Sequence, residues 1–244
     1  MPELSVLKVA GSQALAEVER LRAEFPETGR YPVLLGDDDD VDGIEESLDD
    51  DRTTSAILDG STRIEPRRWF AERDEEYMGD VTISDIGLVL RTAMRSARRR
   101  LTAVFQQNTW PSDMVPATEA IGIVTHLDGQ KPKSEVMIGL FAVDHPWQVF
   151  AHLKWGGWNA CPYPEEHCAL HRYWETLYGA QVVSITSDVV QCWVERPPMN
   201  RAASISLAHE QYLYCADIVD QGTQSDIVLA ATLNGANYWY FWWD

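Results

Sequence analysis

Four side chains in the last third of the sequence have the types that acid–base chemistry needs. They are His167, Asp188, Glu210 and Asp220. The histidine is the main acid–base candidate, because the unperturbed pKa of an imidazole lies near neutrality. Two carboxylates could divide the roles of acid and base if burial moved their pKa values apart. For Asp217 and Asp220 a structural role is favoured, because Asp at a helix end commonly bonds to nearby backbone N–H groups.

A loop with two adjacent glycines offers a place where a ligand could bind. The loop is Trp155-Gly156-Gly157-Trp158-Asn159. Its glycines would allow a ligand to approach the backbone closely, and Trp155 or Trp158 could stack on it. The other ligand-binding candidates are Asn159, Arg172, Asp217 and Gln221.

One cluster has the residue types of a zinc site: Cys161, His167, Cys168 and His171. Zinc prefers nitrogen and sulfur ligands, and two histidines four positions apart share a helical face. However, the cluster has no Cys-x-x-Cys pair. A buried free thiol commonly behaves as a small hydrophobic group. The sequence therefore favours a structural role for these residues over a metal site.

A second metal-like pattern lies in the acidic stretch, where Asp38, Asp40 and Asp42 alternate before Gly43. This spacing superficially fits a calcium-binding loop. The preceding residues, 33–35, have the pattern of a strand where such a loop needs a helix, and Asp49 replaces the usual bidentate Glu. We expect a solvated acidic loop here, and no metal or cofactor for the protein.

The charge of the chain limits its partners. The 244 residues carry a formal net charge of −18. Such a surface repels nucleic acid and anionic lipid, and it speeds association with a basic protein. The simpler interpretation is that the charge keeps the protein soluble.

Other global features predict a soluble cytoplasmic protein. No apolar stretch approaches the roughly 20 residues that span a bilayer. The start, Met1-Pro2-Glu3-Leu4, lacks the basic and apolar regions of a signal peptide. The four cysteines are too few for a disulfide framework, so we expect free thiols.

Hydrophobic patterns in the N-terminal part predict two helices and several strands. Apolar residues at helical spacing predict helices over 13–25, ended by Pro26 and Gly29, and over 84–107. Strands are expected at 31–36 and 118–127, with a further strand at Ile64–Phe70.

The C-terminal part is rich in tryptophan and predicts a compact unit. Strands are expected at 136–143, 147–155, 182–186 and 189–194, with a turn at Ser187-Asp188. Helices are expected at 164–178, near 200–215, and from an N-cap at Ser225 to Gly235. The closing aromatic run 238–244 predicts a buried strand, since aromatic side chains each bury about 150–250 Å².

These elements together predict an α+β fold with a mixed or antiparallel sheet packed by helices and an aromatic C-terminal strand. We expect an N-terminal α/β portion over 1–130, which could be integral to the same fold. An aromatic-rich α+β domain is expected over 131–244. The sequence gives no oligomeric state.

Ordered motifs in the C-terminal part resemble a known family. They begin with Trp155-Gly156-Gly157-Trp158-Asn159-Ala160-Cys161-Pro162 and continue through Glu166-His167, Arg172-Tyr173-Trp174, Tyr178-Gly179-Ala180, Asp188-Val189, Arg196-Pro197-Pro198, Glu210-Gln211-Tyr212, Asp217–Gly222 and Tyr238–Asp244. Over roughly 135–244 the chain resembles the bacterial domain of unknown function family numbered 4253. Residues 31–36 and the acidic residues after them are similar to the upstream part of its longer members.

The resemblance implies a bacterial cytosolic protein and brings no established activity. Its motif-matching polar residues are Asn159, His167, Arg172, Asp188, Glu210, Asp217, Asp220 and Gln221, whereas Cys168 and His171 fall between the motifs.

Two functions remain open from the sequence. The first is a non-catalytic binding protein, for example an immunity-type protein that masks a basic effector. The second is an enzyme or ligand-binding domain with a pocket at the Trp-Gly-Gly-Trp-Asn loop. Catalysis is therefore uncertain, and the first alternative is favoured.

Overall fold

The computed structural model describes residues 4–47, 51–79, 110–111, 114 and 131–244. The fold is α+β, with six strands in one mixed sheet of order β1-β3-β2-β4-β5-β6. Strands β2 and β4 pair in parallel, and the other neighbours pair antiparallel. The strands are β1 (Leu4–Val9), β2 (Arg30–Gly36), β3 (Val136–Ala142), β4 (Ala180–Ile185), β5 (Val189–Val194) and β6 (Tyr238–Trp242).

Strand β2 connects the two halves of the sheet. It lies between β3 and β4, and six of its seven residues are buried. Tyr31, Val33 and Leu35 belong to the larger core, whereas Leu34 belongs to a smaller core on the other face. A near-continuous apolar strand is the expected pattern for a position covered on both faces.

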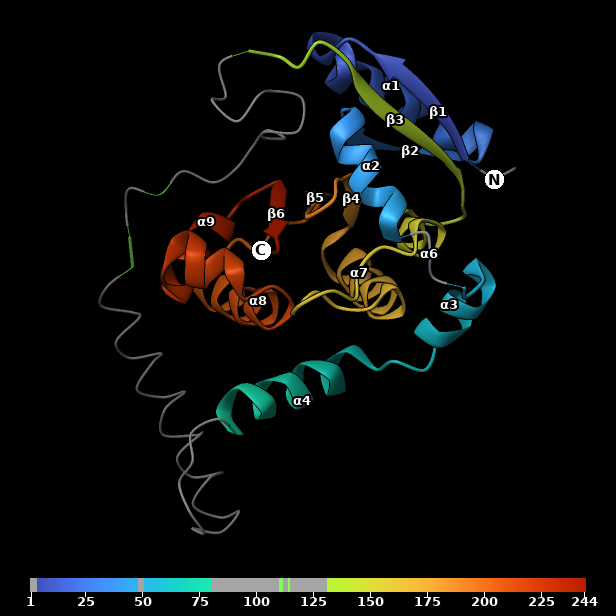
Figure 1. The fold of residues 1–244 in the computed structure, drawn as a ribbon. Coiled ribbons are helices and arrows are strands. Elements are labelled where there is room, and N and C mark those ends of the chain that lie inside the picture. The colour runs from blue at the N-terminus through green and yellow to red at the C-terminus, as the bar shows by residue number, and fades with distance from the viewer. Residues whose placement is uncertain (1–3, 48–50, 80–109, 112–113, 115–130) are drawn as a thin grey trace, which may run out of the picture.

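Helices cover both faces of the sheet (Figure 1). Helix α1 (Gly11–Thr28) packs Ala14 and Val18 against β2 and β3. The larger core receives residues from α2 (Asp38–Ser47), α3 (Thr54–Ser61), α4 (Pro66–Gly79), α6 (Val149–Leu153), α7 (Pro164–Tyr178), α8 (Arg201–Tyr214) and α9 (Asp226–Leu233). Among the described residues, no helix has the length and apolar character to cross a bilayer.

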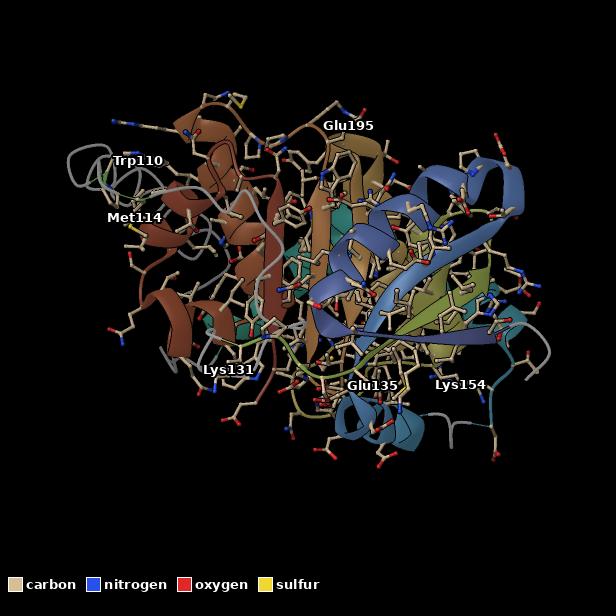
Figure 2. All side chains as sticks on the ribbon, turned by 90° about the horizontal axis from the view of Figure 1, so that it is seen from above. Trp110, Met114, Lys131, Glu135, Lys154 and Glu195 are labelled. Atoms are coloured by element: carbon tan, nitrogen blue, oxygen red, sulfur yellow. The ribbon has the colours of Figure 1, made fainter. Side chains whose placement is uncertain are left out.

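Most C-terminal predictions are confirmed. Helix α7 begins with Pro164 in its first turn and ends at Gly179, which has a φ of 63°. The hairpin of β4 and β5, the strand β3, the helices α8 and α9 and the aromatic strand β6 are all present. Trp110 lies at the end of the molecule formed by the C-terminal helices, where the Arg201 guanidinium stacks 5.1 Å from its ring (Figure 2).

The predicted strand at 147–155 is wrong. The chain instead forms a 3₁₀ turn (Pro146–Gln148) followed by α6. Val149, Phe150, Ala151 and Leu153 are all buried. A short segment that is apolar all round has no distinguishing period, so its sequence pattern does not separate a helix from a strand.

One N-terminal prediction is also wrong, and two are confirmed in part. The expected strand at Ile64–Phe70 runs into α4, which begins with Pro66 at a position where helices accept proline. The acidic stretch, expected as a loop with a helix start, forms α2, whose first turn contains three aspartates that complement the positive helix end. Helix α1 continues past Pro26 to Thr28 before Gly29 ends it. The expected helix at 84–107 and the expected strand at 118–127 lie outside the described residues.

Candidate functional site

The strongest acid–base candidate, His167, lies in the core of the C-terminal part. Helix α7 presents His167 and His171 one turn apart, and both are buried, with exposed fractions of 0% and 1%. Helix α8 places Tyr214 against both rings. The Tyr214 hydroxyl lies 2.7 Å from His167 Nδ1 and 2.9 Å from His171 Nε2. One phenol therefore connects the two imidazoles.

One cysteine contacts each imidazole at its second ring nitrogen. Cys161 Sγ lies 3.4 Å from His167 Nε2. Cys192 Sγ, on β5, lies 3.7 Å from His171 Nδ1. The five side chains form a continuous buried path, which we call the core chain: Cys192, His171, Tyr214, His167 and Cys161.

The direction of donation along the core chain follows from a backbone contact. The Pro162 carbonyl hydrogen-bonds to the His167 ring, and a carbonyl can only accept. Because Nδ1 faces Tyr214, we assign the proton of His167 to Nε2. Tyr214 then donates to His167 and accepts from His171 Nε2–H. The remaining nitrogen of His171 faces the Cys192 thiol as an acceptor.

Aromatic rings surround the core chain. Phe150 stacks on His167 with ring centroids 4.7 Å apart, and Trp155 and Trp243 also pack against that ring. Burial lowers the pKa of His171 to about 3 and lowers the pKa of His167 well below its usual value. Burial also raises the pKa of Tyr214 far above its usual value. All three groups are therefore neutral at physiological pH.

The proposed zinc ligands do not gather around one point. The two histidines face the Tyr214 hydroxyl, whereas Cys168 is fully buried among the apolar residues of the core. All four cysteines are free and buried, and burial raises the thiol pKa of Cys168 to about 12. Across the described ranges, no group of three or more His, Cys, Asp or Glu side chains could hold a metal ion.

Asp188 is a structural carboxylate. Its two oxygens accept hydrogen bonds from the Thr186 hydroxyl at 3.2 Å and from Trp242 Nε1 at 2.9 Å. Its backbone carbonyl accepts from the N–H of Trp243. This residue therefore ties the β4–β5 turn to the end of β6.

Three other polar candidates meet at Asp244. Asn159 Nδ2 donates to the Asp244 carbonyl at 2.8 Å. Asp217 accepts from the Asp244 backbone N–H at 3.1 Å, and Gln221 Nε2 donates to both Asp217 and Asp244. Together with Asp188, these residues hold the segment Trp242–Asp244 on the body of the protein. Asp220 lies next to this cluster in sequence and is exposed.

Glu210 lies in a separate environment on α8. Its oxygens accept from the Tyr173 hydroxyl and from Trp174 Nε1, each at 3.0 Å. Burial raises the pKa of Glu210, and the two donors oppose that shift. The expected pocket of His167, Asp188, Glu210 and Asp220 is thus not formed as one group: the first three bond to different partners and the fourth is exposed.

The Trp-Gly-Gly-Trp-Asn loop packs directly on the core chain. A Cβ on Gly156, whose φ is 113°, would lie 2.6 Å from His167 Nε2 and 2.2 Å from the Pro162 carbonyl oxygen. Trp155 is fully buried and donates from Nε1 to the Thr186 carbonyl, whereas Trp158 is half-buried against it. Because Gly156 has no side chain, the backbone of the loop packs closely against the His167 ring. The sequence had predicted such a close approach for a ligand.

The remaining ligand candidate, Arg172, also has intramolecular contacts. Its guanidinium donates to the Ser61 carbonyl at 3.0 Å and stacks over Trp147. These contacts connect α7 to the end of α3 and to the turn before α6.

The acidic candidates lie on α2, away from these groups in sequence. Asp40 contacts Lys133 Nζ at 2.6 Å, and Asp37 contacts the same nitrogen at 2.8 Å. Asp38 contacts Lys8 Nζ at 3.4 Å, and Asp42 is exposed. The helical backbone does not wrap these carboxylates around one cation, as a calcium loop does.

Sequence reasoning identified the two histidines and missed the residues that join them. Tyr214 falls within the helix expected near 200–215, and Cys192 falls within the strand expected at 189–194. The partners are far apart in sequence, since Tyr214 lies 47 positions after His167. The one local signal was the four-residue spacing of the histidines, which places both side chains on the same face of the helix.

Comparison with known proteins supports the family prediction for the C-terminal part. No curated protein and no solved structure matches the chain. Residues 137–244 match the family model described as Domain of unknown function (DUF4253), as the resemblance predicted for this part of the chain.

Proposed function

We propose that this protein is a non-catalytic binding protein of the bacterial cytoplasm that captures a basic protein partner. The observation that carries the proposal is that most of the polar motif residues are bonded within the fold. His167 is buried in the core chain, while Asp188, Asp217 and Asn159 hold the C-terminal segment. A catalytic group needs access to a substrate, and these groups have intramolecular partners instead.

The charge distribution supports a basic partner. Residues 1–50 contain 14 Asp and Glu against 4 Lys and Arg, so they supply more than half of the net charge of −18. Asp38, Asp39 and Asp42 on α2 are exposed. Such a field raises the rate of association with a cationic protein and disfavours nucleic acid and anionic membrane. An immunity-type protein that masks a basic effector is the concrete form of this proposal.

The test is capture by the tagged full-length protein from its own cytosol, followed by binding measurements with the purified candidate. The experiment compares about 50 mM with about 300 mM salt, because screening weakens contacts between exposed charges. We expect one basic protein to be retained at low salt and lost at high salt. If no basic protein associates at low salt, the proposal is wrong.

Two charge variants localise the contact. The first replaces Asp38, Asp39 and Asp42 with Asn, and the control replaces the exposed Glu72, Glu75 and Glu76 of α4 with Gln. Each changes the net charge by the same amount. We expect the α2 variant to bind the partner at least tenfold more slowly than the control, since steering acts mainly on the association rate. Equal rates would mean that α2 is not the contact.

The alternative function is ligand binding at the Trp-Gly-Gly-Trp-Asn loop. It is favoured by one observation: Tyr163 is 57% exposed and lies beside Gly157, next to the half-buried Trp158. These rings could stack on a flat molecule. A small-molecule screen that measures tryptophan fluorescence tests this alternative, with Trp158→Phe as the control. A compound that changes the fluorescence of the unaltered protein but not that of the variant supports the loop site.

A further inference from the structure

The core chain has a hydrogen-bonding property that the proposed function does not use. Each of its contacts contains one donor and one acceptor when both imidazoles are neutral. Tyr214 has a single hydroxyl proton and lies between two rings that each carry one N–H. With both imidazoles neutral, every contact of the core chain is therefore satisfied without an additional proton.

An added proton cannot be accommodated by this geometry. Protonation of His167 at Nδ1 would turn the acceptor of the Tyr214 hydroxyl into a second donor. The Tyr214 oxygen would then face an N–H from each ring, and its own proton would lose its acceptor. Protonation of His171 at Nδ1 would likewise turn the acceptor of the Cys192 thiol into a donor. A proton on either ring therefore removes one contact of the core chain.

The surrounding core already contains donors without an acceptor. The indole N–H groups of Trp239 and Trp243 are buried without a hydrogen-bond partner in the described part of the chain. A buried unpaired donor is costly, so a further N–H donor here is unfavourable.

The other titratable groups around the rings do not offset the new charge. They come from the loop (Cys161), α7 (Cys168), β5 (Cys192), α8 (Tyr214) and the segment after α8 (Cys215). Burial raises the pKa of each of these groups, so all are neutral in acid. The carboxylate of Glu210 accepts from Tyr173 and Trp174 instead of from either imidazole.

We propose that the core chain is an acid-sensitive lock. With both imidazoles neutral, it fastens α7, α8, β5 and the Trp155–Asn159 loop to one another. Uptake of a proton at Nδ1 of either ring removes an acceptor: the Tyr214 hydroxyl loses His167, and the Cys192 thiol loses His171. The charged ring is hydrated only when the core opens, and opening exposes the second ring to a proton. The C-terminal part then opens in a single step that is linked to two protons.

The pH window follows from the direction of the pKa shifts. Both histidines have a folded pKa below the ordinary value of 6.5, and that of His171 is about 3. Their stabilisation is therefore fully present above pH 6.5 and is lost as the pH falls below it toward the folded values. With two protons taken up, the unfolding equilibrium constant rises about a hundredfold per pH unit within this window.

The test measures urea unfolding of the full chain between about pH 8 and about pH 5, with His167→Gln and His171→Gln as variants. Glutamine offers a donor and an acceptor but does not titrate. In each variant the unfolding equilibrium constant should change about tenfold per pH unit instead of about a hundredfold, because one of the two linked protons is removed. The control, His209→Gln, alters an exposed histidine and should leave the dependence unchanged. An unchanged dependence in both core variants overturns the proposal.

A second measurement applies if the core variants do not fold. Unfolding the unaltered protein by urea in weakly buffered solution at about pH 6 should take up about 1.5 protons, the fraction carried by two free histidines at that pH. Uptake of less than half a proton contradicts the lock. Both experiments are repeated with a chelator: unchanged curves support the lock, and a loss of acid sensitivity would assign it to a bound cation.

Discussion

The C-terminal part and the N-terminal part of this molecule use their polar residues in opposite ways. In the C-terminal part the histidines, the central tyrosine and the motif carboxylates bond to one another and to the backbone within an aromatic core. In the N-terminal part the charged groups of α2 lie at the surface and contact lysines. The polar motif residues of the C-terminal part thus stabilise the fold of this chain, while the acidic surface of the N-terminal part is the basis of the proposed recognition.

The largest expected effect tests how strongly the C-terminal core depends on its aromatic residues. Trp174 is fully buried, stacks on Phe241 and donates to Glu210. Trp174→Ala should lower the free energy of unfolding by about 3–5 kcal/mol, because it leaves a large cavity. In the smaller core, Val18→Ala should cost only about 1–2 kcal/mol for two methyl groups. Urea unfolding measures both, and equal losses would contradict the contrast between the two cores.

The next effect tests the close packing of the loop on His167. Gly156→Ala places a methyl group against the Pro162 carbonyl and the His167 ring at a φ of 113°. We expect a loss of about 2–4 kcal/mol from strain and displacement of the loop. Gly235 is the matched control, since its φ is 79° and nothing lies within 4 Å of its Cβ position. Gly235→Ala should cost about 1 kcal/mol, from backbone strain alone. Similar losses in thermal unfolding would show that the loop does not rest on the histidine.

A smaller effect distinguishes the structural carboxylates from the exposed one. Asp188→Ala removes the acceptor of the Trp242 indole and of the Thr186 hydroxyl. The expected loss is about 1–3 kcal/mol, because buried donors are left unpaired. Asp220→Ala, at an exposed position, should change stability by less than about 0.5 kcal/mol. If the Asp220 variant were the more damaging, Asp220 would have a partner that this account lacks.

The smallest effect concerns the surface of the N-terminal part. Arg20 contacts Glu17 and Glu24 along α1, and about half of its side chain is exposed. Arg20→Ala should lower stability by less than Val18→Ala does, and by less still at high salt. A loss as large as that of Val18→Ala would show that charges stabilise this part as strongly as packing does. Urea unfolding at two salt concentrations provides the measurement.

Local signals in the sequence correctly predicted those helices and strands whose ends are marked by a proline, a glycine or a turn. Pro164 and Gly179 bound α7 as expected, and the turn at Ser187-Asp188 separates β4 from β5. The signals failed where no period exists, as in the uniformly apolar α6, and where charge suggested a loop but complemented a helix end, as in α2.

The candidate site was predicted as a set of residues and not as an arrangement. His167, Asp188 and Glu210 were chosen for their types, but their partners Tyr214, Trp242 and Tyr173 depend on how distant segments pack. The convergence of Asn159, Asp217 and Gln221 on Asp244 likewise joins three segments of the chain. Such pairings arise from tertiary packing, which no local pattern encodes.

The most direct test of the central claim is a nitrogen-15 NMR titration of the histidine side chains in the folded protein between about pH 8 and about pH 6, a range in which a free imidazole changes charge. The account predicts that the rings of His167 and His171 stay neutral throughout, each with its proton fixed on Nε2. A ring of His167 or His171 that titrates near pH 6.5 would contradict the account, because that ring would be open to water and available for chemistry.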